Sequence, residues 1–271
     1  MKRKWYSVPY LVWLVIFSVV PLLFVAYFAF TTRSGAWTLA NMQKILQPRY
    51  MAVLGESIVT ALECTLICLL VGYPTAYFLA SKELTKKQAL VVLIMVPMWM
   101  NFLLRTYAMM SLLETNGVIN TMLEAIGLPK LQLIGTKSAV VMGMVYNYLP
   151  FMILPIYTVL SKLDDGVLEA AQDLGANAWQ TFSRVVLPLS IPGIISGITM
   201  VFLPSITTFA ISLMLGSGKV YLAGDMIEEL FISLGNKNVG SALSLILMVF
   251  ILISIGLMRK ADPDGEGGAL M

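Results

Sequence analysis

Long runs of apolar residues, separated by short polar stretches, recur along the whole chain. We interpret six of them as membrane-spanning helices, at residues 8–30, 57–79, 88–112, 138–160, 192–215 and 239–258. Each run has about 20–25 residues, enough to cross about 30 Å of hydrocarbon at 1.5 Å per residue. Backbone groups in lipid must be paired within their own segment, so we expect helices. The pattern predicts an all-α membrane protein with a single transmembrane domain over residues 1–261.

The positions of basic residues predict the orientation in the membrane. With the N-terminus inside, ten Lys and Arg residues fall in the inner segments and seven in the outer loops. The inner ones also crowd the ends of the spans, as cytoplasmic charges do. We therefore expect both termini in the cytoplasm, together with the polar loop 162–191. Residues 262–271 are rich in Gly and acidic residues and are predicted to form a flexible tail.

Composition supports the membrane assignment and narrows the possible chemistry. Hydrophobic residues make up 58% of the 271 residues, charged residues 12%, and the mean hydropathy is +0.84. A soluble domain carries about 25% charged residues. The sequence has no His, the commonest metal ligand and general base. Cys64 and Cys68 are too few for a zinc site, so we expect them to be packing residues and predict no metal.

Proline and glycine positions predict how the spans bend and pack. Kinks are expected at the prolines inside the spans, because each removes a backbone donor: Pro21, Pro74, Pro97, Pro150, Pro155 and Pro204. Gly193 and Gly197 lie four apart at the start of the fifth span, a spacing that lets a second helix approach closely.

Two outer loops have the periodicity of amphipathic helices, at residues 118–126 and 222–234. In the second, Met226, Leu230 and other apolar residues share one face. Acidic residues occupy the opposite face and form a candidate outer docking surface: Asp225, Glu228 and Glu229.

The loop 162–191 is polar in a chain otherwise adapted to lipid. Asp164 or Asp165 is expected to cap a short helix that ends at Gly175, the residue type best suited to a left-handed cap. Asn177 is expected to cap a second helix that stops near Pro188. Two short helices at the membrane surface indicate a docking surface for a soluble partner. A linker without a partner is the alternative.

The spacing within this loop is E-A-A, three residues, G, nine residues, an aliphatic residue, one residue, then L-P. It resembles the cytoplasmic EAA loop of ABC importer permeases, although Val185 stands where the family usually has Ile. The resemblance implies a six-helix, MetI-like type I importer permease coupled to a separate ATPase. The implied coupling residues are Glu169, Ala170, Ala171, Gly175, Leu187 and Pro188.

The phosphate-binding pattern G-x-x-x-x-G-K-[ST] does not occur in the sequence. We therefore expect a non-catalytic subunit that binds no cofactor itself. ATP and Mg²⁺ are expected on the partner ATPase.

Three further segments narrow the resemblance to the spermidine/putrescine permeases of the PotB type: GYPTAYFLA at 72–80, VPMWMNFLLRTY at 96–107 and LPFMILP at 149–155. The family implies a heterodimer with a PotC-like permease, a PotA-like ATPase dimer and a PotD-like extracellular or periplasmic binding protein that delivers the polyamine. It also implies a multi-pass position in the bacterial cytoplasmic membrane. Two alternatives stay open, namely an ABC permease for another small solute and an ion-coupled secondary transporter. We find no internal repeat, which disfavours the second alternative.

A pathway for a polyamine needs acids and aromatic faces. The candidates in the spans are Glu63, Trp99, Tyr107 and Tyr146. Glu63 and Arg105 each lie about two turns from the outer end of a predicted span. We predict that they form an ion pair, because an unpaired charge at that depth costs at least about 2.5–3.5 kcal/mol. A purely structural pair and a pathway role for Glu63 are both open.

Overall fold

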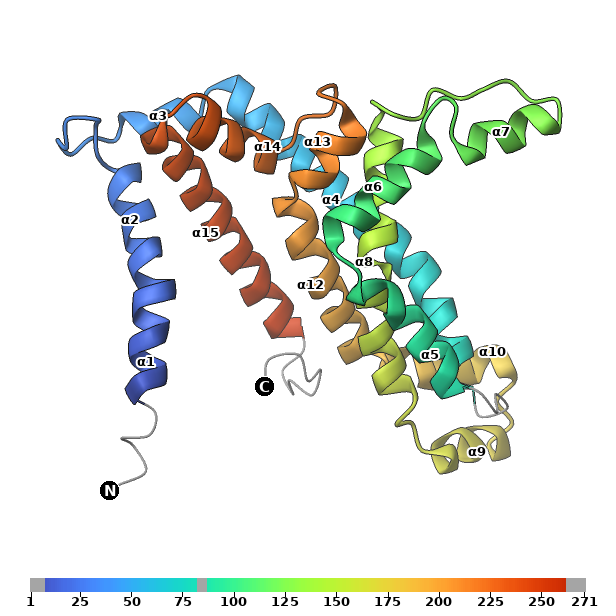
Figure 1. Cartoon of the computed structure of the whole chain (residues 1–271). Coiled ribbons are helices and arrows are strands. Elements are labelled where there is room, and N and C mark those ends of the chain that lie inside the picture. The colour runs from blue at the N-terminus through green and yellow to red at the C-terminus, as the bar shows by residue number, and fades with distance from the viewer. Residues whose placement is uncertain (1–7, 82–86, 262–271) are drawn as a thin grey trace.

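The computed structural model describes residues 8–81 and 87–261, most of them in helices (Figure 1). In chain order the elements, with π- and 3₁₀-helices marked η, are α1 Val8–Leu14, η2 Val15–Val19, α2 Val20–Ala29, α3 Ala40–Ile45, α4 Pro48–Ala80, α5 Lys87–Met95, η3 Val96–Trp99, α6 Phe102–Leu113, α7 Val118–Ala125, α8 Lys137–Leu160, α9 Asp165–Asp173, α10 Ala178–Thr181, η4 Phe182–Val186, α11 Leu187–Leu189, α12 Ile191–Thr207, α13 Ala210–Gly216, α14 Ala223–Glu228, η5 Glu229–Ser233 and α15 Lys237–Ala261.

Four stretches in the described part of the chain are long and apolar enough to cross a membrane as single helical spans: Pro9–Ala29, Pro48–Ala80, Lys137–Leu160 and Lys237–Met258. Two further crossings are each a bent pair of helices. The prediction of six apolar crossings is therefore met when each bent pair counts as one span. The spans predicted at 88–112 and 192–215 are not continuous helices but are broken, and the break in the first lies beside Pro97, where a kink was predicted.

The third crossing breaks where α5 and η3 meet α6, with a bend of 95°. Pro97 lies in η3, and Asn101 then starts α6 with its side chain accepting hydrogen bonds from Leu103 N and Leu104 N. A proline followed by an N-cap residue ends one helix and begins another. The break thus has a local cause in the sequence.

The fifth crossing is also interrupted at both of its ends. The helical stretch Ala178–Leu189 meets Ile191–Thr207 at a bend of 59°. At the C-terminal end of α12, Thr208 has extended dihedral angles and separates α12 from α13. The continuous apolar run 192–215 is thus a 17-residue helix followed by a short separate one.

The centre of the bundle is the packing of α4, α8 and α12 against one another. Met152 on α8 lies between glycines of the other two helices, since a Cβ on Gly72 would be 2.9 Å from its Cγ and one on Gly197 2.7 Å from its Sδ. Gly193 approaches the α8 backbone in the same way. The predicted close approach at Gly193 and Gly197 is confirmed, and Cys64 and Cys68 are fully buried free thiols in this core.

A second core joins α2, α3, α14 and α15 to α12 and to the N-terminal half of α4. Asn238, near the start of α15, donates from Nδ2 to the carbonyl oxygens of Phe28 and Thr31, at 3.1 Å and 2.7 Å. This contact connects the start of the last span, α15, to the end of the first span, α2. Lower down, α1 and the end of α15 are separate in the view of Figure 1.

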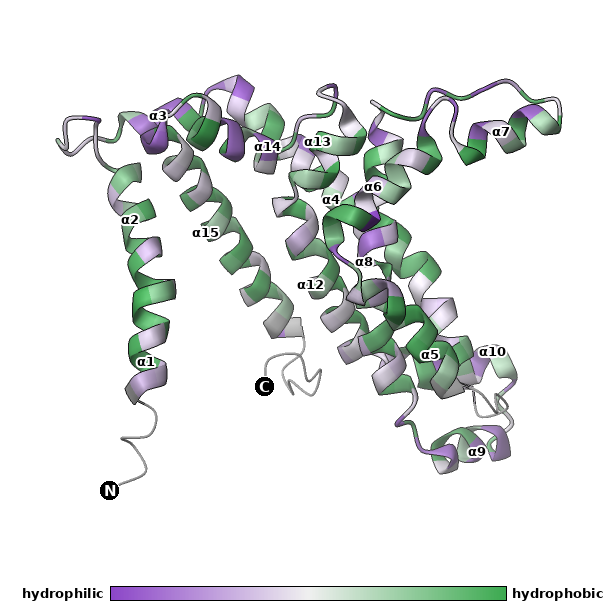
Figure 2. Cartoon of the chain, in the orientation of Figure 1, coloured by the Kyte–Doolittle hydropathy of each residue, from purple (hydrophilic) through white to green (hydrophobic). Residues whose placement is uncertain are grey.

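Polar residues concentrate at the two ends of the bundle. Hydrophobic residues dominate the long helices, whereas α3, α9 and parts of the α14 region are hydrophilic (Figure 2). The start of α1, the end of α15 and the α9–α10 hairpin lie at one end, and α3, α7 and α14 at the other (Figure 1). We keep the cytoplasmic assignment of the first end as a prediction. The predicted tail 262–271 falls outside the described residues.

Candidate functional site

The first helix of the hairpin, α9, is delimited by local hydrogen bonds at both ends. Asp164 accepts a hydrogen bond from Gly166 N at 3.1 Å. At the other end Gly175 has φ +83°, while its N–H donates to Gln172 O and Ala176 N–H donates to Ala171 O. This pair of bonds is a Schellman motif, which satisfies carbonyls that the helix end leaves free. The predicted N-cap and C-cap are both confirmed.

The second helical stretch runs from α10 through η4 to α11 and leads into α12. Asn177 caps it with a reciprocal pair, in which Gln180 N donates to Asn177 Oδ1 and Asn177 N donates to Gln180 Oε1, both at 2.9 Å. Such a capping box fixes the start of a helix. The stretch ends at Leu189, close to the predicted stop at Pro188.

Apolar side chains on this hairpin face outward. Leu174 is 90% exposed and Trp179 is 72% exposed. A pocket of about 370 Å³ lies in the angle between the two helices, lined by Ala171, Leu174, Gly175, Ala176, Gln180, Arg184 and Val185. Among the residues expected from the sequence, five are exposed and Ala171 is half-buried; the exposed ones are Glu169, Ala170, Gly175, Leu187 and Pro188. Large exposed apolar side chains around a hollow are typical of a protein–protein interface.

The predicted ion pair between Glu63 and Arg105 is wrong. Glu63 instead binds Lys137, whose Nζ lies 2.9 Å from Glu63 Oε1 and 3.0 Å from Glu56 Oε1. The two glutamates are seven residues apart on one face of α4. Lys137 begins α8 beside them. The pair of acids at this spacing was a sequence signal that the prediction did not use.

Arg105 lies elsewhere because the third crossing is bent. Its depth was counted along a straight helix, whereas it sits on α6 just past the 95° bend. The side chain is 5% exposed, and Nη1 donates to Pro97 O at 3.1 Å across the break. Its Nε has no hydrogen-bond partner among the described residues. Arg105 therefore braces the bend.

The remaining pathway candidates are open to the surroundings of the isolated chain. Trp99, Tyr107 and Tyr146 are all exposed, and the Glu63 side chain is 44% exposed. Trp99 lies at the end of η3, Tyr107 on α6 and Tyr146 on α8. The ring contacts found within residues 8–81 and 87–261 do not join these three aromatic residues.

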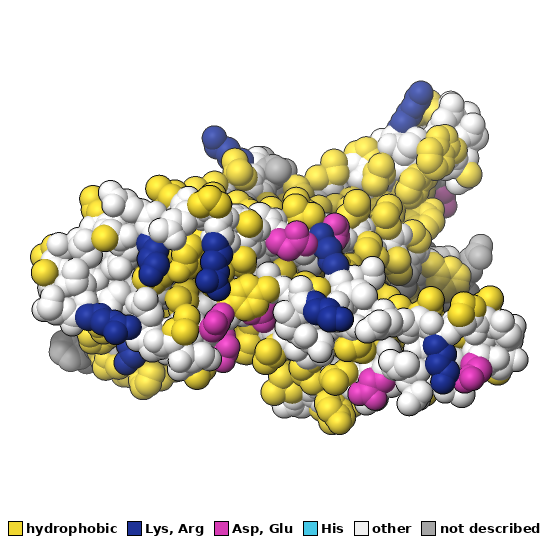
Figure 3. Space-filling model, turned by 90° about the horizontal axis from the view of Figure 1, so that it is seen from above, with side chains coloured by type: hydrophobic (Ala, Val, Ile, Leu, Met, Phe, Trp, Pro, Cys, Tyr) yellow, Lys and Arg dark blue, Asp and Glu magenta, His cyan; other side chains and the backbone are white. Residues whose placement is uncertain are grey.

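Asp225 is not part of an exposed acidic face, so this part of the predicted docking surface is wrong. It is buried, its Oδ2 accepts from Leu222 N at 2.8 Å, and its Oδ1 lies 2.9 Å from Ser212 Oγ. Burial is the main cause that raises the pKa of Asp225 to about 6. Glu229 is hydrogen-bonded to Tyr221. On the face seen in Figure 3, acidic side chains are scattered among basic and apolar ones.

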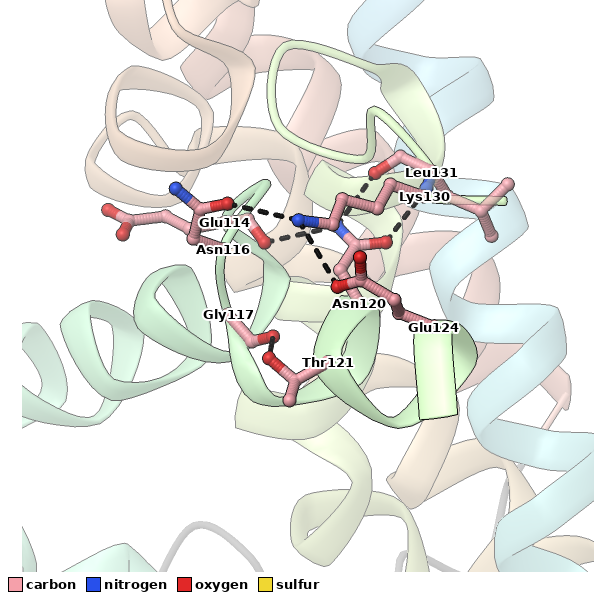
Figure 4. A network of polar contacts seen from close by, with 8 residues as sticks. All are labelled: Glu114, Asn116, Gly117, Asn120, Thr121, Glu124, Lys130 and Leu131. Atoms are coloured by element: carbon pink, nitrogen blue, oxygen red, sulfur yellow. Dashed lines mark hydrogen bonds and ion pairs between the residues drawn. The ribbon is translucent and has the colours of Figure 1, made fainter. Parts of the chain in front are cut away.

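A polar network that the sequence analysis missed supports the outer helix α7 (Figure 4). Asn120 is fully buried, and its Nδ2 donates to Glu114 O at 3.1 Å and to Leu131 O at 2.9 Å. Its Oδ1 accepts from Leu131 N at 2.8 Å. Lys130 adds an ion pair with Glu124 at 3.4 Å. One asparagine thus joins both ends of the loop that carries α7, whose predicted existence is confirmed.

Comparison with known proteins gives matches over nearly the whole chain. Residues 1–264 match the family described as "Binding-protein-dependent transport system inner membrane component". The chain is 39% identical to the spermidine/putrescine transport system permease protein PotB of Haemophilus influenzae, over 92% of this chain and 90% of that protein. It is 40% identical to PotB of Escherichia coli strain K12, over 92% and 94% of the two chains.

A solved structure shares the fold. A bacterial ABC transporter that imports the acidic polysaccharide alginate contains a chain with a TM-score of 0.75 and 18% identity, and the match covers 96% of both chains.

Proposed function

Because this chain belongs to the family of binding-protein-dependent transport system inner membrane components, we propose that it is a permease subunit of an ATP-driven polyamine importer. Membership confirms the resemblance noted in the sequence, and the fold is that of an ABC importer permease. The protein is a multi-pass component of the inner membrane. The identity of 39–40% to spermidine/putrescine permeases over 92% of the chain supports the choice of cargo.

The hairpin is the observation that supports coupling to ATP hydrolysis. Its two capped helices place Leu174 and Trp179 outward around a hollow that contains Gly175. We assign this surface to a separate ATPase subunit, with the remaining contacts supplied by the motif residues Glu169, Ala170, Ala171, Leu187 and Pro188. The chain lacks a phosphate-binding loop, so ATP and Mg²⁺ belong to that partner.

Three partners complete the proposed machine. A second permease of the PotC type forms the pathway together with this chain, and a PotA-type ATPase dimer docks on the hairpin. A PotD-type binding protein delivers the polyamine at the outer end. The hairpin and α7 lie at opposite ends of the bundle (Figure 1), as delivery on one side and energy input on the other require.

Within the bundle we propose that a polyamine meets carboxylates and aromatic faces. Glu63 lies half-exposed beside Glu56, and the two carboxylates already hold one ammonium group, that of Lys137. Trp99, Tyr107 and Tyr146 offer exposed rings that can attract an ammonium group. Glu228 and Glu229 remain the candidate outer contacts after Asp225 is removed from the set.

The test is uptake by the four components reconstituted in liposomes, with labelled spermidine competed by putrescine, spermine and an unrelated sugar. We expect uptake that needs ATP, the ATPase and the binding protein, and that polyamines alone compete. Competition by the sugar but not by polyamines would reassign the cargo. Uptake by this chain alone under an ion gradient would contradict the ATP-driven mechanism.

A further inference from the structure

Four aromatic residues join the hairpin to the C-terminal part of α4, and we call them the aromatic clasp: Tyr73, Tyr77, Trp179 and Phe182. Phe182, the first residue of η4, packs edge-on against both tyrosines of α4. The ring centroids are 6.0 Å from Tyr73 and 5.6 Å from Tyr77, with interplanar angles of 78° and 82°. Trp179 lies against the same phenylalanine at 5.6 Å. Edge-to-face packing at these distances is a favourable and directional contact.

A hydrogen bond closes the clasp from the other side. Tyr73 Oη lies 3.0 Å from Ser190 Oγ, and Ser190 Oγ donates to Leu187 O at 2.8 Å. Since a serine hydroxyl has one proton, the Tyr73 hydroxyl is the donor in the first bond. Ser190 is fully buried at the joint where α11 meets α12 with a bend of 59°. Helix α4 therefore contacts the stretch 182–190 at both of its ends, at Phe182 through ring packing and at Ser190 through a hydrogen bond.

The rest of the hairpin surface is free to receive a partner. Leu174 on the far helix is 90% exposed, and Gly175 has no heavy atom within 4 Å of its built Cβ. A displacement of α9 and α10 by a partner is thus passed to the bundle through the residues that contact α4, namely Phe182 and Ser190. The segment that carries Phe182, η4, is a π-helix, a form that often occurs at functional positions.

Helix α4 is suited to carry that motion across the membrane. It is a single helix of 33 residues, and it carries Tyr73 and Tyr77 near one end and Glu56 and Glu63 nearer the other. A displacement of the clasp therefore moves the outer carboxylates as part of the same helix. Packed helices shift between discrete arrangements, so small movements at one end can reset the other.

From this geometry we infer that the clasp transmits movements of the ATPase-docking hairpin to α4, with Tyr73, Tyr77 and Phe182 as positioning residues. The inference rests on the proposed function, because it takes the hairpin as the ATPase contact. It assigns a role to residues outside the EAA pattern. It predicts that loosening the clasp separates ATP hydrolysis from transport while leaving the docking surface intact.

The first test compares Tyr77→Leu with Tyr77→Phe in the reconstituted four-component system. Neither change touches the hairpin surface. Tyr77→Leu removes a ring contact and should lower the polyamine taken up per ATP hydrolysed about threefold to tenfold. Tyr77→Phe keeps the ring and should behave as the wild type. An uptake-to-ATP ratio unchanged in assembled Tyr77→Leu complexes would overturn the inference.

Tyr73→Phe provides the test if Tyr77→Leu fails to assemble, since it removes only one oxygen atom. It should lower the same ratio about twofold to tenfold. Ser190→Ala should have a similar effect, and the double variant should lose no more than either single one, because both remove the same bond. A wild-type ratio in Tyr73→Phe would contradict the clasp.

A readout independent of the cargo separates this inference from the proposed function. Met51, exposed near the outer end of α4, can be replaced by Cys, since the native Cys64 and Cys68 are fully buried. Labelling of Met51→Cys should change on ATP binding, and Tyr77→Leu should abolish that change. Absent polyamine uptake by the wild type contradicts only the cargo. An ATP-dependent change that persists in Tyr77→Leu contradicts the clasp.

Discussion

Replacing Gly193 by Ala tests whether the contact between α8 and α12 is as tight as the structure has it. A Cβ at this position would lie 2.9 Å from Pro155 O and 3.0 Å from Ile156 Cα. Both are backbone atoms, so the clash is relieved only if one helix moves. Overpacking of this kind costs about 1–3 kcal/mol. Removing a glycine from a helix offsets up to about 1 kcal/mol. With the full offset, we therefore expect Gly193→Ala to destabilise the protein by up to about 2 kcal/mol.

Gly256→Ala is the matched control for this change. Gly256 also lies in a long apolar helix, α15. A Cβ added there would meet no heavy atom within 4 Å apart from the neighbouring backbone of its own helix. This variant should leave stability unchanged or raise it by up to about 1 kcal/mol. The assay is thermal unfolding of the purified permease complex in nanodiscs, where each kcal/mol shifts the midpoint by about 2–4 °C. Equal midpoints for the two variants would refute the packing argument.

Three further predictions concern charge and backbone conformation. Gly175→Val should lower the free energy of unfolding by about 1–2 kcal/mol, because Gly175 has a left-handed backbone with φ +83°. It should also reduce copurification of the ATPase subunit, and unchanged copurification and uptake would contradict the coupling assignment. Burial raises the pKa of Asp225 from 3.8 to about 6, so the folded state binds this proton more tightly than the unfolded chain. Stability should therefore rise as pH falls from about 6 to about 4, by up to about 1.4 kcal/mol per pH unit, and Asp225→Asn should flatten that part of the profile of unfolding midpoint against pH. Lys137→Gln leaves Glu56 and Glu63 without their shared cation. Because these groups are half-exposed, the change should lower the free energy of unfolding by less than about 1 kcal/mol, and by less still in high salt. Unfolding midpoints at two salt concentrations would show this.

The sequence predicted the crossings and the hairpin well because both depend on local information. Apolar length alone identifies a crossing. The hairpin's caps act over two to four residues, as Asp164 with Gly166 and Asn177 with Gln180 do. Gly175 needs no partner at all to reveal its left-handed position.

Breaks within a crossing were harder to locate because composition is uniform across them. A proline alone does not break a helix here, since Pro74 lies within the continuous helix α4 and Pro150 within α8. The break at Pro97 differs because Asn101 follows and caps a new helix. A proline with a polar cap a few residues later was therefore the usable signal. Pro204 and Thr208 have the same four-residue spacing at the other break, but Thr208 does not cap α13, whose N-cap residue is Phe209 without a side-chain hydrogen bond.

Partners across the bundle could not be read from the chain because depth along a straight helix does not fix position in a bent one. Arg105 was assigned to Glu63 by depth, but the 95° bend places it against Pro97 O. The ammonium that Glu63 binds comes from Lys137, 74 residues away, and the hydrogen bond that closes the clasp joins residues 117 apart.

The contrast between short-range and long-range contacts also separates the two parts of the proposed mechanism. The surface proposed to receive the ATPase is built from short-range contacts, so it can be identified from a motif. The connection from that surface to the pathway depends on Tyr73, Tyr77 and Phe182 meeting across elements far apart in the chain. A permease can therefore keep its EAA pattern and still lose coupling through a change in α4. Variants outside the motif are for this reason the sharper test of how the hairpin drives transport.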